Sequence, residues 1–318
     1  MTVSRPAPSV PGSPLPGSSA PGLQPGVQPG LEVERIEAGG ATFVVETRGL
    51  GRDSARLRLV WLHGWGQSRA AMAPLARAFE TAALNQLVDM PGFGEAPPPP
   101  EDWGTEQYGD MLARWLDTQN AGERLATVLV GHSFGCRVAI RLAARHPRLV
   151  DAMVLIAGAG LRRHRPLPVR AKAAAMRMAL RLARRVDALA GTGHADRLRE
   201  RMGSADYRNA GRLRPVLVRV VNEDLAPLAA TVRHPVQLVY GELDDQTPPE
   251  FGHRFAELMA DAELVLLPNF DHYTILSSGR HQVQLRMQQF LDRILPRNPP
   301  CNPPLPPLPP APDTDAPR

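Results

Sequence analysis

The sequence is poor in cysteine, and its two cysteines lie far apart. Among 318 residues, only Cys136 and Cys301 are cysteines. Two distant cysteines cannot form the disulfide framework of a small secreted domain, nor the cysteine cluster of a structural zinc site. We therefore expect Cys136 to be a small buried apolar residue, and we expect the protein to use neither a metal nor an organic cofactor.

Long apolar runs are also missing. No stretch is apolar over the roughly 20 residues that a membrane-spanning helix requires. The first thirty residues lack the basic start and the continuous apolar run of a secretory signal. The sequence therefore predicts a cytoplasmic protein without a transmembrane segment.

Proline, in contrast, is abundant but concentrated at the two ends. Of 34 prolines, 8 precede Leu31 and 11 lie from Pro296 onward. Neither end contains an apolar run that could bury a core, so we expect disordered tails over residues 1–30 and 296–318. Residues 31–295 remain, which is enough for one large domain.

Short apolar runs alternate with amphipathic segments through most of this domain. The pattern predicts strands over residues 42–48, 56–64, 85–90, 126–131, 152–158, 235–241 and 262–268. It predicts helices over residues 69–80, 106–118, 135–146, 251–260 and 282–295. Buried strands that alternate with helices are typical of α/β proteins. We predict a mostly parallel, twisted sheet with helices on both faces, built from residues 31–160 and 223–295.

The alternation breaks between residues 161 and 222, where the pattern predicts helices alone. Residues 161–220 contain 16 basic and 4 acidic side chains, whereas the rest of the chain is net acidic. We interpret residues 161–222 as an arginine-rich helical lid. Its charge indicates either a solvated helix face or a docking surface for an acidic carrier protein, an anionic substrate such as a CoA ester, or an anionic membrane surface. Tyr207 is its only aromatic residue, which argues against a nucleic-acid partner.

One short motif indicates nucleophilic catalysis. Residues 131–135, GHSFG, fit the pattern G-x-S-x-G between a predicted strand and a predicted helix. Such a sharp turn lifts a serine hydroxyl above the sheet edge, at a helix N-terminus that favours developing negative charge. We predict that Ser133 is a nucleophile, with a simple tight turn as the alternative.

Serine is a weak nucleophile and needs a base that a carboxylate orients. After a turn of this type, the acid and then the histidine follow the serine in the chain. Asp244 follows the predicted strand 235–241, and His272 follows the last predicted strand. We therefore predict a triad of Ser133, Asp244 and His272.

Other residues could fill these roles less well. Asp245 is the rival to Asp244, and Asp271 adjoins the histidine, although neighbouring side chains rarely meet in the required geometry. The alternative candidates for the base are His132, His146 and His281.

Acyl chemistry also needs donors for the oxyanion of the tetrahedral intermediate. One donor is expected from the backbone N–H of Phe134, the residue after the nucleophile. The second is expected from the compact loop HGWGQ, residues 63–67, where the N–H of Trp65 is the best candidate.

Together these motifs resemble the α/β-hydrolase superfamily. They are HGWGQ, DMPGFG (residues 89–94), GHSFG, GELDDQTP and DHYTIL. The superfamily pattern G-x-x-D-x-x-x-P corresponds to Gly241, Asp244 and Pro248, which favours Asp244 over Asp245. The superfamily also has a helical lid at this point in the chain. This chain departs from it just before His272, where it has Asn269-Phe270-Asp271 and lacks the usual glycine.

The resemblance implies a serine hydrolase that cleaves a carboxylic ester or thioester through an acyl-enzyme. The segment HGWG, residues 63–66, is similar to the corresponding segment of carboxylesterases that cleave methyl esters of acyl carrier-protein conjugates. Acyl transfer or perhydrolysis would use the same residues. The alternative from another class is a catalytically silent binding protein with a hydrolase fold.

Overall fold

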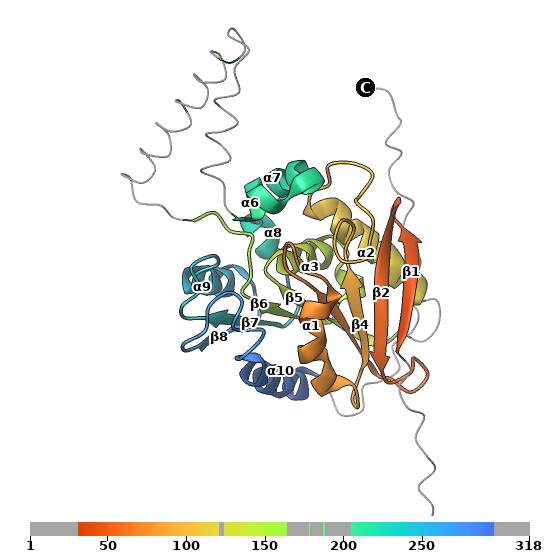
Figure 1. The fold of residues 1–318 in the computed structure, drawn as a ribbon. Coiled ribbons are helices and arrows are strands. Elements are labelled where there is room, and N and C mark those ends of the chain that lie inside the picture. Colours follow the sequence, from red (N-terminus) through yellow and green to blue (C-terminus); the bar gives the residue numbers. More distant parts are fainter. Residues whose placement is uncertain (1–30, 121–123, 164–177, 179–186, 188–204, 296–318) are drawn as a thin grey trace, which may run out of the picture.

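The computed structural model describes residues 31–120, 124–163, 178, 187 and 205–295. Strands from this part of the chain form one eight-stranded sheet (Figure 1). The strand order is β1-β2-β4-β3-β5-β6-β7-β8. The strands are β1 (Glu32–Ala38), β2 (Ala41–Gly49), β3 (Leu57–Leu62), β4 (Leu84–Asp89), β5 (Ala126–His132), β6 (Ala152–Ile156), β7 (Val236–Gly241) and β8 (Ala262–Leu267).

Six neighbouring strands are mutually parallel, in the order β4-β3-β5-β6-β7-β8. Strand β2 is antiparallel to β4, and β1 is antiparallel to β2. The predicted α/β fold with a mostly parallel sheet is therefore confirmed. Because the carboxyl ends of parallel strands meet at one edge, the loops after β3, β5, β7 and β8 are brought together there.

Strand β1 was not predicted. It is an edge strand whose residues are mostly exposed, so it has no apolar run to mark it. The signal that could have revealed it is the Gly39-Gly40 pair, in which both residues have positive φ, at 59° and 79°. Two such residues between strands are typical of a tight β-hairpin.

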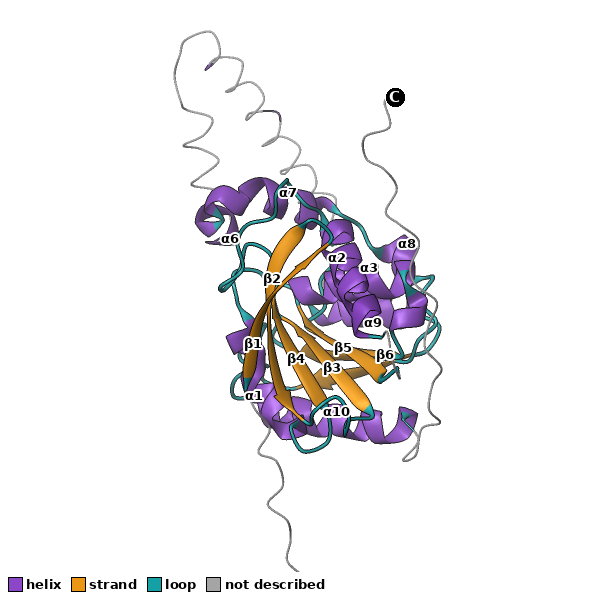
Figure 2. Ribbon diagram, turned by 90° about the vertical axis from the view of Figure 1, so that its right-hand side faces the viewer, coloured by secondary structure: helices purple, strands orange, loops and turns teal. Residues whose placement is uncertain are grey.

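Helices cover both faces of the sheet (Figure 2). One face carries α1 (Arg69–Ala76), which continues as the 3₁₀ turn η1 (Arg77–Phe79), and α10 (Arg280–Ile294). The other face carries α2 (Thr105–Gln119), α3 (Phe134–Arg145), α8 (Ala226–Ala229) and α9 (Pro249–Leu258). A further 3₁₀ turn, η2 (Pro147–Leu149), follows α3.

The central strands supply side chains to two apolar cores. In β3, Leu59 and Trp61 pack toward α1 and α10, whereas Val60 and Leu62 pack toward α2 and α3. All four side chains are fully buried. A strand that is covered on both faces reads as a continuous apolar run, which is why periodicity identified these strands.

Residues 161–163 and 205–222 of the predicted lid are described, and only the second stretch contains helices. It contains α6 (Ala205–Asn209), the 3₁₀ turn η3 (Gly211–Leu213) and α7 (Arg214–Asn222). Leu213 lies against Gly92 in the loop after β4, where a Cβ would come within 2.8 Å of the leucine side chain. Arg137 of α3 donates through Nη1 to the carbonyl oxygen of Val220, at 3.0 Å, and so connects α7 to the helix that follows Ser133.

Several predictions concern residues outside the described part of the chain. These are the two predicted tails, residues 1–30 and 296–318, and most of the predicted lid between residues 164 and 204.

Candidate active site

Ser133 stands at the turn between β5 and α3 with φ 49° and ψ −105°, a backbone conformation that is unusual for a residue with a side chain. Its flanking glycines have no room for side chains. A Cβ at Gly131 would lie 2.7 Å from the nitrogen of Cys136, and one at Gly135 would overlap the carbonyl oxygen of Leu62. The G-x-S-x-G spacing is thus a steric requirement of this turn.

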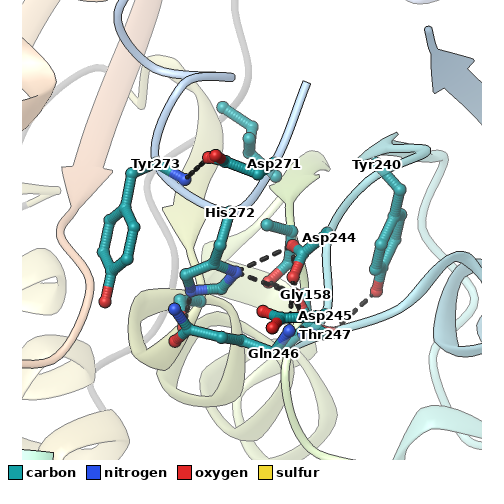
Figure 3. Close-up of polar contacts among 12 residues, drawn as sticks. Gly158, Tyr240, Asp244, Asp245, Gln246, Thr247, Asp271, His272 and Tyr273 are labelled. Atoms are coloured by element: carbon teal, nitrogen blue, oxygen red, sulfur yellow. Dashed lines mark hydrogen bonds and ion pairs between the residues drawn. The ribbon is translucent and has the colours of Figure 1, made fainter. Parts of the chain in front are cut away.

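The structure brings together the three side chains that were predicted to form a triad. Nδ1 of His272 lies 2.8 Å from Oδ2 of Asp244 (Figure 3). Nε2 of the same ring lies 3.0 Å from Oγ of Ser133. Asp244 and His272 are 3% and 4% exposed. This geometry orients the imidazole with one nitrogen toward a carboxylate and the other toward a hydroxyl.

The carboxylate of Asp244 accepts four hydrogen bonds. Oδ1 accepts the backbone N–H groups of Gln246 and Thr247, both at 2.8 Å. Oδ2 accepts from the Thr247 hydroxyl and from His272, both at 2.8 Å. Burial alone would raise the pKa of Asp244, but the hydrogen bond and charge of His272 and the donors of Thr247 outweigh burial and lower that pKa. Asp244 is therefore ionised at neutral pH.

The loop that carries His272 turns sharply at Asn269, which has φ 65°. Asn269 belongs to the stretch before His272 in which a glycine was expected and is absent. Asparagine is one of the few residues with a side chain that adopts the left-handed region readily, so it can replace glycine here.

The rival acidic residues lie elsewhere. The side chain of Asp245 is exposed. The carboxylate of Asp271 accepts hydrogen bonds from the backbone N–H groups of Tyr273 and Thr274, at 2.9 and 2.8 Å, and points away from the ring of His272 (Figure 3). These two carboxylates are not placed to orient the imidazole.

The rival histidines are also separated from the serine hydroxyl. His281 is exposed on α10, and His146 bonds Asp110 through Nε2 at 2.7 Å. His132 is buried, and its two ring nitrogens face Gln67 and the backbone of His272.

One predicted oxyanion donor, the N–H of Phe134, directly follows Ser133 in the chain. The other, the N–H of Trp65, lies in the loop after β3. Phe134 is the first residue of α3, so its N–H has no partner within the helix. Among the described residues, neither this N–H nor that of Trp65 donates a hydrogen bond. The rings of Trp65 and Phe134 pack edge to face with centroids 5.5 Å apart, and both contact Phe93. The assignment of these N–H groups stays a prediction.

Thr247 is the residue at this site that the sequence did not reveal. Its hydroxyl lies within 3.1 Å of three groups, which are Oδ2 of Asp244, Nδ1 of His272 and the carbonyl oxygen of Ala157. Nothing in the motif GELDDQTP marks a threonine three residues after the acid as its partner. The contact depends on the local turn, which brings the backbone of Thr247 back to the carboxylate.

In the part of the chain that the structure describes, no group of three or more His, Cys, Asp or Glu side chains is placed to hold a metal ion. Within the same residues, no helix has the length and apolar character that crossing a membrane requires.

Comparison with known sequences gives a family match over most of the chain. The model of the alpha/beta hydrolase family matches residues 59–283. The chain is 29% identical over 246 residues to the pimeloyl-[acyl-carrier protein] methyl ester esterase of Chromobacterium violaceum, covering 73% of this chain and 92% of that one. It is 27% identical over 252 residues to the 2-(acetamidomethylene)succinate hydrolase of Mesorhizobium japonicum, covering 75% and 88%.

Solved structures show the same fold. A thermophilic esterase from Thermogutta terrifontis superposes with a TM-score of 0.60 at 18% identity, covering 82% of this chain and 99% of that one.

Proposed function

Since this chain belongs to the alpha/beta hydrolase family, and is a hydrolase, we propose that it cleaves a carboxylic ester or thioester through an acyl-enzyme on Ser133. One observation carries the proposal. The imidazole of His272 lies at hydrogen-bond distance from both the Ser133 hydroxyl, at 3.0 Å, and the Asp244 carboxylate, at 2.8 Å.

In the first half of the reaction, Nε2 of His272 removes the proton of Ser133 while Oγ attacks the carbonyl carbon of the substrate. Asp244 accepts the Nδ1–H and stabilises the imidazolium that forms. The imidazolium then donates its proton to the leaving alcohol or thiol, and the acyl group remains on Oγ.

In the second half, water attacks the acyl-enzyme. His272 takes a proton from this water and returns it to Oγ as the acid product leaves. In both halves, the N–H groups of Phe134 and Trp65 donate to the oxyanion. The N-terminus of α3 adds its dipole, because Ser133 is the residue that precedes the first turn of this helix.

The acyl part of the substrate is proposed to be attached to an acidic carrier protein, with a small alcohol as the leaving group. The Chromobacterium violaceum relative is named for an acyl carrier-protein ester. The described ends of the predicted lid hold five exposed arginines, which are Arg162, Arg163, Arg208, Arg212 and Arg219. Exposed arginines attract an acidic partner, and this attraction weakens with salt. Hydrolysis of a carrier-protein ester whose rate is the same at low and high salt would contradict this part of the proposal.

The decisive experiment uses a fluorophosphonate probe, which phosphonylates an activated serine. We expect the full-length chain to be labelled once, on the peptide that contains Ser133, and we expect Ser133→Ala to remain unlabelled. An unlabelled wild-type chain with native folding would favour a catalytically silent binding protein.

Product analysis then separates hydrolysis from transfer to another acceptor. With a p-nitrophenyl ester as the donor, we expect the free acid to be the main product, even when an alcohol or hydrogen peroxide is added. An ester or peracid as the main product would instead indicate acyl transfer or perhydrolysis by the same three residues.

A further inference from the structure

His132 directly precedes the proposed nucleophile, but its side chain has no role in the reaction described above. Its imidazole is buried and packs against that of His272, with the ring centroids 4.9 Å apart. Burial, together with the charge of His272, lowers the pKa of His132 to about 3. The ring is therefore neutral at neutral pH and carries a single N–H.

One edge of this ring contacts the backbone of the proposed base. Nε2 of His132 lies 3.0 Å from the carbonyl oxygen of His272. Both neighbours of the ring, the carbonyl oxygen of His272 and Oε1 of Gln67, can only accept a hydrogen bond. Because Oε1 of Gln67 already accepts the N–H of Gly64, we place the single hydrogen of the neutral ring on Nε2, and Nδ1 then makes a contact with Oε1 that is not a hydrogen bond. Within the described part of the chain, no other donor bonds this carbonyl.

The opposite edge of the ring faces the loop that carries Trp65. Nδ1 of His132 lies 3.1 Å from Oε1 of Gln67, and this oxygen accepts the N–H of Gly64 at 2.9 Å. A Cβ at Gly64 would lie 2.7 Å from both Oε1 of Gln67 and Nδ1 of His132. The loop after β3 therefore closes directly on the ring, and the glycine is required for that closure.

We propose that His132 is a positioning residue, which sets the distance between the nucleophile and its base. Its Nε2–H holds the backbone of His272, while its other edge abuts the loop with the proposed oxyanion donor. Because His132 and Ser133 are adjacent in the chain, one short rigid link connects the serine to the histidine loop. This inference rests on the proposed roles of Ser133 and His272.

Substituting His132 with asparagine or with glutamine tests the two edges of the ring separately. The amide of His132→Asn reaches only as far as Nδ1, so it loses the bond to the carbonyl of His272. The longer His132→Gln can place its NH₂ group near the position of Nε2. The measured quantity is the second-order rate constant of Ser133 phosphonylation by a fluorophosphonate.

We expect His132→Asn to slow phosphonylation by about tenfold, because small displacements of a catalytic base have large effects on rate. We expect His132→Gln to recover most of that loss. With a p-nitrophenyl ester, His132→Asn should lower kcat and leave KM near the wild-type value. A purely structural role would lower the melting temperature without this pattern.

The matched control is His146→Asn at the opposite end of α3, which also removes an imidazole hydrogen bond and should leave the rate constant unchanged. If His132→Asn does not fold, His132→Met, which lacks a donor, replaces it in the comparison with His132→Gln. Equal rate constants for the wild type and the donor-less variant would overturn the inference. Absence of labelling in the wild type would instead contradict the proposed function.

Discussion

The hydroxyl of Thr247 lies 2.8 Å from Oδ2 of Asp244, the same oxygen that accepts the hydrogen bond of His272. Thr247→Val keeps the shape of the side chain but removes this donor. We expect phosphonylation of Ser133 to slow by about three- to tenfold, since a misoriented carboxylate misorients the imidazole. We also expect a loss of about 1–2 kcal/mol in the free energy of unfolding, because Oδ2 of Asp244 and the carbonyl oxygen of Ala157 share the one hydrogen of this buried hydroxyl and both lose it.

Thr247→Ser is the control for this prediction, because it keeps the hydroxyl and removes only a methyl group. It should have nearly the wild-type rate. If the serine variant is slow while the valine variant keeps the wild-type rate, packing of the methyl group, and not the hydrogen bond, determines the rate.

Asp244→Asn should lower kcat by about 10³-fold or more, because an amide stabilises the wrong tautomer of the histidine and does not stabilise the imidazolium. The adjacent Asp245→Asn, at an exposed position, should change kcat by less than about twofold. Steady-state kinetics on one p-nitrophenyl ester compares the two variants directly. A larger loss in Asp245→Asn would mean that the acid has been assigned to the wrong residue.

Two buried histidines make stability depend on pH. Burial is the largest cause that lowers the pKa of His63 to about 4 and that of His132 to about 3. In the unfolded chain both titrate near 6.5. As the pH falls from about 6.5 to about 4, the unfolded state binds protons that the folded state does not. The free energy of unfolding should therefore fall by about 1.4 kcal/mol per pH unit for each histidine.

Urea unfolding at about pH 6 and about pH 5 measures this slope. His132→Asn removes one of the two groups, so its slope should be shallower by about 1.4 kcal/mol per pH unit. An unchanged slope would show that His132 is protonated in the folded state.

The turn at Ser133 should not tolerate even one added carbon atom at its flanking glycines. At Gly135 a Cβ would overlap the backbone carbonyl of Leu62, which belongs to the central strand β3. We expect Gly135→Ala to destabilise the fold by about 3 kcal/mol, because neither backbone segment can move without disturbing the sheet. Gly51→Ala, with no atom within 4 Å of its Cβ, should have a melting temperature close to that of the wild type.

The parallel sheet could be predicted because its strands are buried on both faces. Leu59 and Val60, for example, pack into opposite cores, so the whole strand reads as apolar. The exposed β1 lacks that signal. Its register depends on pairing with β2, for instance Glu34 with Val45, which composition does not reveal.

At the site, the positions of Ser133, Asp244 and His272 were predictable because each follows a strand that ends at the same edge of the sheet. The partners that fix them were not. Thr247 and Gln67 act through one hydroxyl and one amide, and which groups these reach depends on loop conformations that local patterns do not encode.

The bond between Arg137 and the end of α7 has a mechanical consequence. Arg137 lies one helical turn after Ser133, so this bond joins α7 to the first turn of α3, beside the proposed nucleophile. A movement of α7 away from α3 must either break this hydrogen bond or displace the first turn of α3. The position of α7 and the backbone that carries Ser133 are thereby coupled through the side chain of Arg137.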